Sequence, residues 1–332
     1  PGIPVDWVER VQEYADGENG SFLEIVKFRG RFIKPCPGTR FYNCCGYQIL
    51  NLGIQCSLGC TYCILQAYFT SPNVRLFANL DDAIQQLTEH LNNSPNQIHR
   101  IGTGEFTDSL LLDPLIHLSE NLVPFFAAQP NAILELKTKT AQVDLLEKMD
   151  HRGHTIVAWS LNPAEVIAKE EAGAATLEER LGAAKRCQGW GYRVAFHFDP
   201  LLAYPGWQQG YQEVVDRLFS AVDPGGIAWI SLGTLRFMPS LKTVIQQRYP
   251  NTSILYEEFV PGLDGKLRYF RDLRVDMYAY LKELLRGIHK DLCVYLCMES
   301  DDVWREAFGF TPAERGGLSG MLDRRALSSF VR

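Results

Sequence analysis

The sequence lacks the features of a membrane or exported protein. It contains no run of about 20 apolar residues, which is the length a membrane-spanning helix needs. Its first residues, Pro1-Gly-Ile-Pro-Val-Asp, show no basic segment followed by an apolar one, as a secretory leader would. We therefore expect a cytoplasmic protein with neither a leader nor a membrane anchor.

Positive charge is also in short supply. Lys and Arg number 33 against 39 Asp and Glu, so the net charge is −6. Bulk electrostatics therefore does not attract nucleic acid, and any polyanion site has to be a local basic patch. The 46% hydrophobic and 22% charged content indicates a folded chain with a sizeable core, and 332 residues fit one large domain with appendages.

Cysteine is present in an odd number, nine, at uneven spacing, which does not fit a disulfide framework but fits thiol chemistry in a reducing compartment. Three of them, Cys56, Cys60 and Cys63, have C-x3-C-x2-C spacing directly after an apolar run. No fourth Cys or His follows at the short spacing of zinc modules, although zinc remains the alternative metal for these thiols. Three thiolates would leave one iron of a [4Fe-4S] cluster open for a substrate or cofactor.

An alternation of strands and helices begins after residue 46. Six β/α units in series predict a parallel sheet with helices outside it, that is, an open partial (β/α)6 barrel in the α/β class. We divide the chain into an N-terminal extension (1–46, with a possible helix at 5–14), the barrel (47–238) and a C-terminal, substrate-side extension (239–332). The predicted strands are 49–54, 98–102, 132–137, 155–161, 192–198 and 227–232, and the helices are 80–91, 114–121, 141–149, 177–189, 208–220, 240–249 and 272–288.

Polar residues follow the predicted strands, where the carboxyl ends of a parallel sheet gather reactive groups. Each also has a structural explanation: a plain turn, a solvated lysine or a core histidine with its partners satisfied. We interpret Tyr62, Glu105, His197 and Asp199 as candidate catalytic residues. The candidate cofactor-binding residues are Gly104, Glu105, Lys139, Ser160 and Asn162.

The cysteine motif resembles the signature of the radical S-adenosylmethionine (SAM) superfamily, and Gly104-Glu105 resembles that superfamily's Gly-Gly-Glu segment. The resemblance implies a [4Fe-4S] cluster on Cys56, Cys60 and Cys63 whose open iron chelates SAM. It also implies an electron donor such as a flavodoxin or ferredoxin. Lys139 would then neutralise the SAM carboxylate.

A narrower resemblance, to the spore photoproduct lyase family, runs from about residue 47 to about 296. It implies cleavage of a thymine dimer in DNA: a 5′-deoxyadenosyl radical removes a hydrogen atom, the link breaks, and a protein group returns hydrogen to the product radical. The matching segments are Tyr62-Cys63 with Leu65-Gln66, Asn73 to Asp82, Arg180 to Arg186, Gly189 to Tyr192, Pro205 to Tyr211, Ile245 to Pro250 and Arg268 to Arg271.

Two positions depart from that family's pattern. Glu105 occupies the place of the hydrogen-donating cysteine, and no Cys lies between Cys63 and Cys187. Tyr62 is retained on one side of the last cluster cysteine, but the other side holds Ile64. A different hydrogen source, or a small molecule or peptide as substrate, therefore stays open, as does a non-catalytic iron–sulfur protein.

Two further groups of residues remain to be assigned. The extra thiols could hold a second cluster, replace the missing hydrogen donor, or stay unligated as small apolar side chains; they are Cys36, Cys44, Cys45, Cys293 and Cys297. A short basic and aromatic stretch could contact DNA phosphates and a base, or could form a solvated hairpin; it contains Lys266, Arg268, Tyr269, Arg271 and Arg274.

Overall fold

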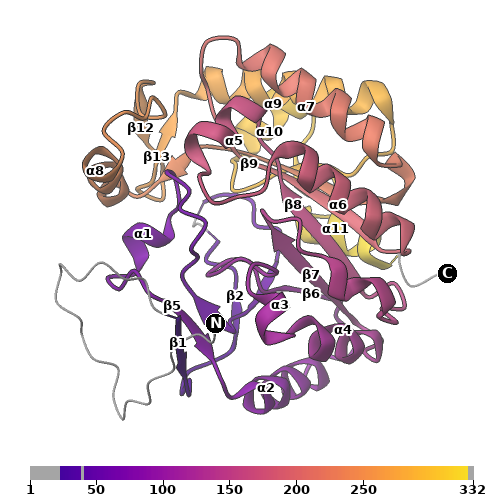
Figure 1. Cartoon of the computed structure of the whole chain (residues 1–332). Helices are drawn as coiled ribbons and strands as arrows, with labels where there is room; N and C mark the ends of the chain where they lie inside the picture. The colour runs from indigo at the N-terminus through magenta and orange to yellow at the C-terminus, as the bar shows by residue number, and fades with distance from the viewer. Residues whose placement is uncertain (1–22, 39–40, 328–332) are drawn as a thin grey trace.

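A curved eight-stranded sheet forms the centre of the computed structural model, which describes residues 23–38 and 41–327 (Figure 1). The possible helix at 5–14 lies outside these residues. The strand order is β14-β10-β9-β8-β7-β6-β3-β2. The six predicted barrel strands are confirmed as parallel neighbours: β3 (Gln48–Leu50), β6 (His99–Gly102), β7 (Ala132–Thr138), β8 (Thr155–Ser160), β9 (Arg193–Leu201) and β10 (Ile227–Thr234).

Each expected extension adds one strand to this sheet. β14 (Val294–Leu296) pairs parallel with β10 at one edge, and β2 (Ile33–Pro35) pairs antiparallel with β3 at the other. Neither edge strand pairs with the other in this strand order, so the barrel stays open. The sheet therefore draws on all three expected segments of the chain.

Helices cover the outer face of the sheet because each has one apolar side and the strands are buried on both faces (Figure 1). In α6 (Leu177–Gly189), whose bounds match the prediction, the Thr176 side chain caps the Glu179 amide and Glu179 returns the bond, which fixes the start of the helix. The other outer helices are α2 (Leu80–Asn92), α4 (Ser119–Ala127), α7 (Trp207–Ala221), α9 (Arg271–Ile288), α10 (Asp301–Phe308) and α11 (Leu318–Leu327).

Two predicted helices were wrong for identifiable reasons. The one at 114–121 is split into α3 (Asp113–Ile116) and α4, because Asp113 accepts hydrogen bonds from both the Ser119 amide and its hydroxyl. The one at 141–149 is reduced to the 3₁₀ turn Asp144–Lys148. There the carbonyls of Thr140 and Ala141 accept side-chain hydrogen bonds from distant residues instead of helical ones.

The first predicted strand, 49–54, divides in two. Its first half is β3, while β4 (Gly53–Ile54) turns away to pair with β5 (Val74–Phe77) in a small sheet that β1 (Leu23–Val26) completes. This turn moves the following cysteine loop away from the strand axis.

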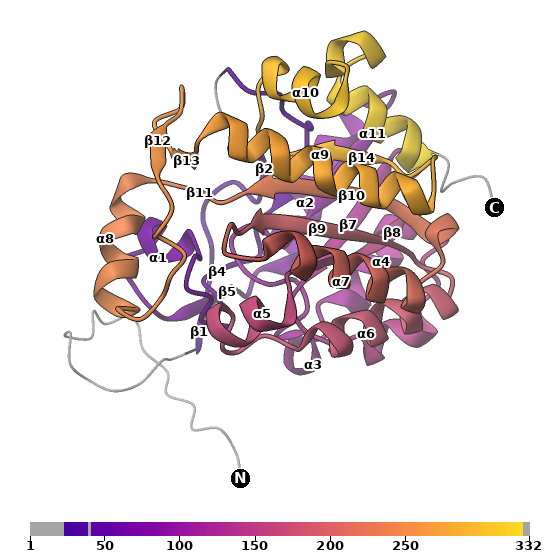
Figure 2. The same cartoon turned by 90° about the horizontal axis from the view of Figure 1, so that it is seen from above.

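A second small sheet and several short helices lie near the cysteine loop (Figure 2). In Figure 2, α1 lies beside α8, and the two helices are in contact. Their bounds are β11 (Arg236–Phe237), β12 (Phe259–Pro261), β13 (Leu267–Tyr269), α1 (Leu65–Tyr68), α5 (Ala164–Glu170) and α8 (Pro239–Arg248), with 3₁₀ turns at Pro224–Gly226 and Pro312–Arg315. None of the helices in the described ranges has the length and apolar character to cross a membrane.

Residues 41–47, which precede β3, connect the two edges of the sheet. The Asn43 amide donates to the Glu299 carbonyl (3.0 Å), and its side chain donates to Asp301 (3.0 Å), both just beyond β14. The Tyr42 hydroxyl accepts from the Leu263 amide at 3.0 Å. These bonds hold the segment across the open side of the barrel.

Candidate functional site

A cavity of about 290 Å³ lies at the carboxyl ends of the barrel strands. β6, β7, β8, β9 and β10 each contribute the residues that follow or end the strand, as parallel sheets of this kind require. The three cysteines of the C-x3-C-x2-C motif line it together with Gly104, Glu105, Lys137, Lys139, Ser160, Asp199 and Arg236. Of the predicted site residues, most therefore meet in one place.

The cysteine loop is held on the segment after α5 by backbone hydrogen bonds. The Thr61 amide donates to the Glu170 carbonyl, and the Gly173 amide to the Leu58 carbonyl, both at 2.9 Å. A Cβ on Gly173 would lie 2.9 Å from that carbonyl oxygen, so only glycine allows this approach. The Gln66 side chain donates to the carbonyls of Cys60 and Thr61 at 3.1 Å. The thiols are thus positioned by tertiary contacts as well as by their spacing.

The donor set fits an iron–sulfur cluster. Cys56, Cys60 and Cys63 line one cavity, and the thiolates of a [4Fe-4S] cube each bind a different iron. Among the described residues, no group of three Cys, His, Asp or Glu side chains is arranged to hold a single metal ion. Burial raises the pKa of the Cys60 thiol to about 12 and raises the pKa of Cys56 and Cys63 as well, so binding a metal would release their protons.

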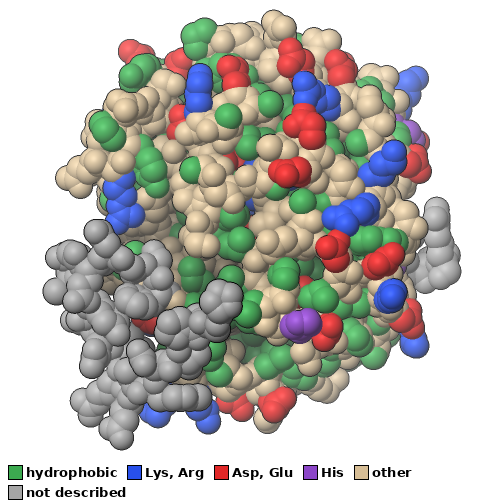
Figure 3. Space-filling model, viewed as in Figure 1, with side chains coloured by type: hydrophobic (Ala, Val, Ile, Leu, Met, Phe, Trp, Pro, Cys, Tyr) green, Lys and Arg blue, Asp and Glu red, His purple; other side chains and the backbone are tan. Residues whose placement is uncertain are grey.

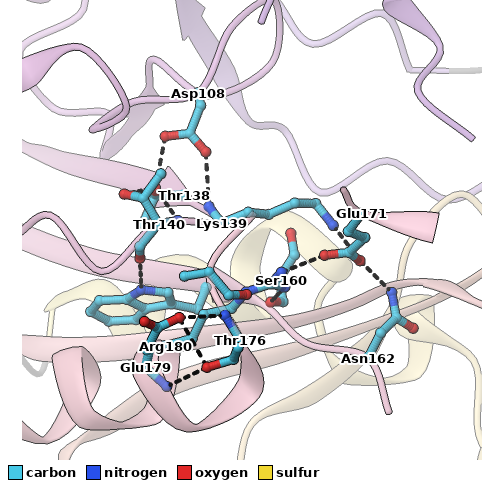
Figure 4. Close-up of polar contacts among 12 residues, drawn as sticks. Asp108, Thr138, Lys139, Thr140, Ser160, Asn162, Glu171, Thr176, Glu179 and Arg180 are labelled. Atoms are coloured by element: carbon cyan, nitrogen blue, oxygen red, sulfur yellow. Dashed lines mark hydrogen bonds and ion pairs between the residues drawn. The ribbon is translucent and has the colours of Figure 1, made fainter. Parts of the chain in front are cut away.

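Glu171 is the centre of a buried polar network that supports this loop, and the sequence analysis missed it (Figure 4). Its carboxylate accepts from Lys139 Nζ at 2.9 Å, from Asn162 at 3.0 Å and from Arg180 at 2.5 Å, and Tyr62 donates to it too. Burial alone would raise the pKa of Glu171, but Lys139 and Arg180 outweigh it and bring the pKa to about 2. The carboxylate therefore stays charged and fixes the Lys139 ammonium beside the cysteines.

Asp108 fixes the same lysine from its backbone side (Figure 4). Its carboxylate accepts from the Lys139 amide (2.8 Å) and the Thr138 hydroxyl (2.7 Å), while the amides of Leu110 and Leu111 donate to it at 3.0 Å. Burial raises its pKa, and these hydrogen bonds oppose the rise. Asp108 and Glu171 had no distinctive sequence signal, since each is one acidic residue among several.

The opposite side of the cavity contains two ion pairs. Lys137 Nζ lies 2.5 Å from the Glu105 carboxylate, and Arg236 lies 2.9 Å from Asp199. Both pairs keep part of their side chains exposed. Lys137 and Arg236 were not predicted, although Lys137 directly follows the buried part of β7.

Two predicted residues do not reach the cavity as expected. Asn162 is fully buried, and its amide serves Glu171 and the Tyr211 hydroxyl, so it supports the network instead of contacting a cofactor. His197 does not line the cavity, whereas Asp199 does: the His197 ring bonds to the buried Glu135 at 2.6 Å. Strand β9 carries both residues, but their partners lie on different elements.

The predicted DNA-contacting stretch is mostly buried or paired, which does not support that role. Arg268 is 1% exposed and bonds to Asp264, and Tyr269 is fully buried. Arg271 pairs with Glu306, and Arg274 with Glu299. Of this stretch, Lys266 lines the cavity. On the face seen in Figure 3, acidic and basic side chains are interspersed, with no continuous basic patch.

The two groups of extra thiols do meet across the open side of the barrel. Cys297 lies within electrostatic range of both Cys36 and Cys45, and the Cys297 sulfur accepts from Arg236 at 3.4 Å. All nine cysteines are unpaired, and four of them line the cavity: Cys36, Cys56, Cys60 and Cys63.

The comparisons with known proteins agree with this site. The family model for spore photoproduct lyase matches residues 44–292. The chain is 31% identical to spore photoproduct lyase from Geobacillus sp. (strain Y412MC61) over 212 residues, which are 63% of this chain and 62% of the relative's length. It is 28% identical to the Bacillus subtilis (strain 168) enzyme over 245 residues, 73% of this chain and 70% of the relative.

Solved structures give the same result. A spore photoproduct lyase double mutant with bound AdoMet and dinucleoside spore photoproduct superimposes with a TM-score of 0.74 at 26% identity, covering 82% of each chain. A single mutant of spore photoproduct lyase gives 0.75 with the same identity and coverage. Because the family model matches most of the chain, the protein belongs to the spore photoproduct lyase family of the radical SAM superfamily.

Proposed function

We propose that the protein is a radical SAM enzyme of the lyase type, acting in DNA repair on a thymine-dimer lesion or a related nucleotide. The observation that carries this proposal is the cavity itself: three cysteines at C-x3-C-x2-C spacing share it with Lys139 and Ser160 at the carboxyl ends of parallel strands. The solved relative holds AdoMet and dinucleoside spore photoproduct. When bound, a reduced [4Fe-4S] cluster and SAM supply a 5′-deoxyadenosyl radical that abstracts hydrogen from the substrate.

We assign a separate role to each group of residues at the cavity. Cys56, Cys60 and Cys63 are the cluster ligands. Lys139, held by Glu171 and Asp108, presents an ammonium to the SAM carboxylate, and Ser160 contributes a hydroxyl. Gly104 lets its backbone approach Lys137 closely, because a Cβ at this position would lie only 2.9 Å from Lys137. The Tyr62 hydroxyl donates its hydrogen bond to Glu171, which supports a positioning role for Tyr62.

Electrons for the cluster would come from a one-electron donor such as a flavodoxin or ferredoxin. The cytoplasm is the compartment that fits, because all nine cysteines are unpaired and that compartment keeps thiols reduced.

A small molecule or peptide is the second candidate substrate. Two observations favour it: the net charge of −6, and the burial of Arg268 and Tyr269, which removes the expected DNA contacts. Lys266 and Arg236, which line the cavity, could still hold one phosphate of a short nucleotide.

The test is anaerobic reconstitution with iron and sulfide, reduction, and addition of SAM with an irradiated thymine dinucleotide. We expect 5′-deoxyadenosine by chromatography and the repaired dinucleotide by mass. A cluster that forms without SAM cleavage would overturn the enzyme proposal. Cleavage with no change in the dinucleotide or in lesion-containing DNA would favour the small-molecule or peptide substrate.

A further inference from the structure

Three basic side chains meet where the hairpin of β12 and β13 reaches the cavity (Figure 2). Lys266 directly precedes β13 and lines the cavity. Arg268 follows on β13 and is the register partner of Arg236 on β11, another lining residue. The charges of both arginines act on Lys266. Because like charges repel one another, such a group needs negative partners.

Carboxylates offset the two arginines but not the lysine. Asp199 accepts from both terminal nitrogens of Arg236, at 3.1 and 2.9 Å. Asp264 accepts from Arg268 at 2.7 Å and from the backbone amide of Lys266 at 3.3 Å. Asp264 therefore holds the hairpin turn and Arg268, and its carboxylate does not pair with the Lys266 ammonium.

The Lys266 ammonium is left with one weak partner. The described residues place no carboxylate oxygen within salt-bridge distance of its Nζ, which donates to the Met298 sulfur at 3.9 Å. A thioether is a weak acceptor, and an ammonium has three hydrogens to donate. Lys266 is also 9% exposed, and burial, followed by the charge of Arg236, lowers its pKa. A buried ammonium in this setting is stabilised when an anion binds beside it.

The charge count indicates which anion fits. Three cations and two carboxylates leave a single positive charge, which matches the single negative charge of a phosphodiester. A phosphomonoester carries about 1.5 to 2 negative charges at neutral pH and would be left partly uncompensated. The SAM carboxylate is already assigned to Lys139, which the Glu171 carboxylate holds beside the cysteines. The anion at Lys266 therefore belongs to the substrate.

We propose that Lys266 binds the phosphodiester that links the two nucleotides of the substrate; this rests on the proposed function and deepens it. The ammonium donates to a phosphate oxygen, while Arg236 and Arg268 stay with Asp199 and Asp264. The cavity therefore selects its substrate by charge as well as by shape. Two thymidines joined by a phosphodiester bind more tightly than the same pair joined by a neutral link.

A cycle of two ligands and two proteins tests this assignment. The ligands are the thymine-dimer lesion of thymidylyl-thymidine and its methylphosphonate analogue, whose link has no charge. Titration calorimetry uses the reconstituted protein with SAM and without reductant, so that no turnover occurs. The unmodified protein should prefer the phosphodiester by about ten-fold or more, as a charge-assisted hydrogen bond provides. In Lys266→Met, which keeps the apolar stem, the two affinities should agree within about two-fold.

The control and the contradicting results are specific. Lys185→Met removes an exposed lysine of α6 outside the cavity and should keep the full preference. A preference that persists in Lys266→Met, or is missing from the unmodified protein, would overturn the assignment of Lys266. Binding of neither ligand by a protein that cleaves SAM would overturn it too and favour the small-molecule or peptide substrate. Failure to cleave SAM on reduction would instead overturn the proposed function.

A second measurement uses the unmodified protein and does not depend on how a variant folds. Acetylation of Lys266 by acetic anhydride, mapped by peptide mass, should slow about three-fold or more when the phosphodiester ligand is bound. Lys185 should react at an unchanged rate and is the internal control. Equal rates at Lys266 with and without the ligand would show that the substrate does not reach this ammonium. Equal protection by inorganic phosphate at the same concentration would overturn the assignment to a phosphodiester.

Discussion

The two sides of the cavity are built differently. The cluster wall, which we define as Cys56, Cys60, Cys63, Lys139 and Glu171, rests on a charge pair that is fully buried: the side chains of Arg180 and Glu171 are both 0% exposed. The far wall, defined as Cys36, Glu105, Lys137, Asp199 and Arg236, uses pairs that stay partly exposed, 23% and 29% for Lys137 and Glu105. A buried pair is costly to break, whereas an exposed one contributes little.

This difference assigns SAM binding to the cluster wall and substrate binding to the far wall. The cluster wall has one fixed arrangement, as expected where SAM must be held in a single pose. The far wall can exchange its partners for groups of a ligand. Of the two departures from the family pattern, Glu105 lies on the far wall, as does the extra thiol Cys36, whereas Ile64 lies beside Cys63. We therefore expect substrate differences mainly on the far wall.

The largest effect should come from removing the cluster ligands. In the Cys56→Ala/Cys60→Ala/Cys63→Ala variant we expect residual iron near zero after reconstitution and no 5′-deoxyadenosine. Cys293→Ala should bind iron like the unmodified protein. Substantial iron left in the triple variant would mean that the extra thiols hold a second cluster.

Glu171→Gln should destabilise the fold by about 3–5 kcal/mol, because it leaves Lys139 and Arg180 without their buried counter-charge. The free energy of unfolding from urea titration measures this. The matched control is Glu178→Gln, which removes the exposed partner of Arg217 and should cost at most about 1 kcal/mol. Equal losses in the two variants would contradict the contrast between the walls.

Acid should remove the same stabilisation. Because the pKa of Glu171 is lowered to about 2 in the folded state, its contribution is complete above the ordinary value of 4.5 and is lost as the pH falls toward 2. The stability difference between the unmodified protein and Glu171→Gln should therefore shrink by about 3 kcal/mol over that range. A pH-independent difference would show that Glu171 is already protonated at neutral pH.

On the far wall, Glu105→Gln should cost about 1 kcal/mol of stability or less, because the pair with Lys137 is partly exposed. It should tighten binding of thymidylyl-thymidine several-fold, since the Lys137 ammonium becomes available to a phosphate. Titration calorimetry at low and high salt measures this, and the gain should fade as salt screens the charges. Weaker binding would indicate that Glu105 itself contacts the substrate.

The smallest effect is expected outside both walls. Arg271→Ala removes an exposed pair with Glu306 and should change the affinity for lesion-containing DNA by no more than two-fold. Lys266→Ala, which alters the cavity lining, is the comparison and should weaken binding more. A larger loss of DNA affinity in Arg271→Ala would support the predicted basic and aromatic contact surface.

Local sequence pattern was enough to predict those helices and strands whose periodicity agrees with their surroundings in the fold. The six strands and α6 were predicted because alternation and apolar runs act over a few residues, and the capping box that the structure shows at the start of α6 acts over the same range. The helix at 114–121 failed because the neighbouring Asp113 accepts hydrogen bonds from Ser119. The helix at 141–149 failed because Trp159 and Arg186 redirect its local hydrogen bonds from elsewhere in the fold.

By itself the sequence determined the cofactor chemistry and the class of fold, because the spacing of Cys56, Cys60 and Cys63 and the order of the strands are local properties of the chain. Only the tertiary structure decided which residues share the cavity. It brought Glu171 and Asp108 to Lys139, buried Asn162, Arg268 and Tyr269 in the interior, and placed Cys36 in the cavity lining. The physical reason is that burial and charge pairing depend on segments far apart in the chain, and no local pattern specifies which segments will meet.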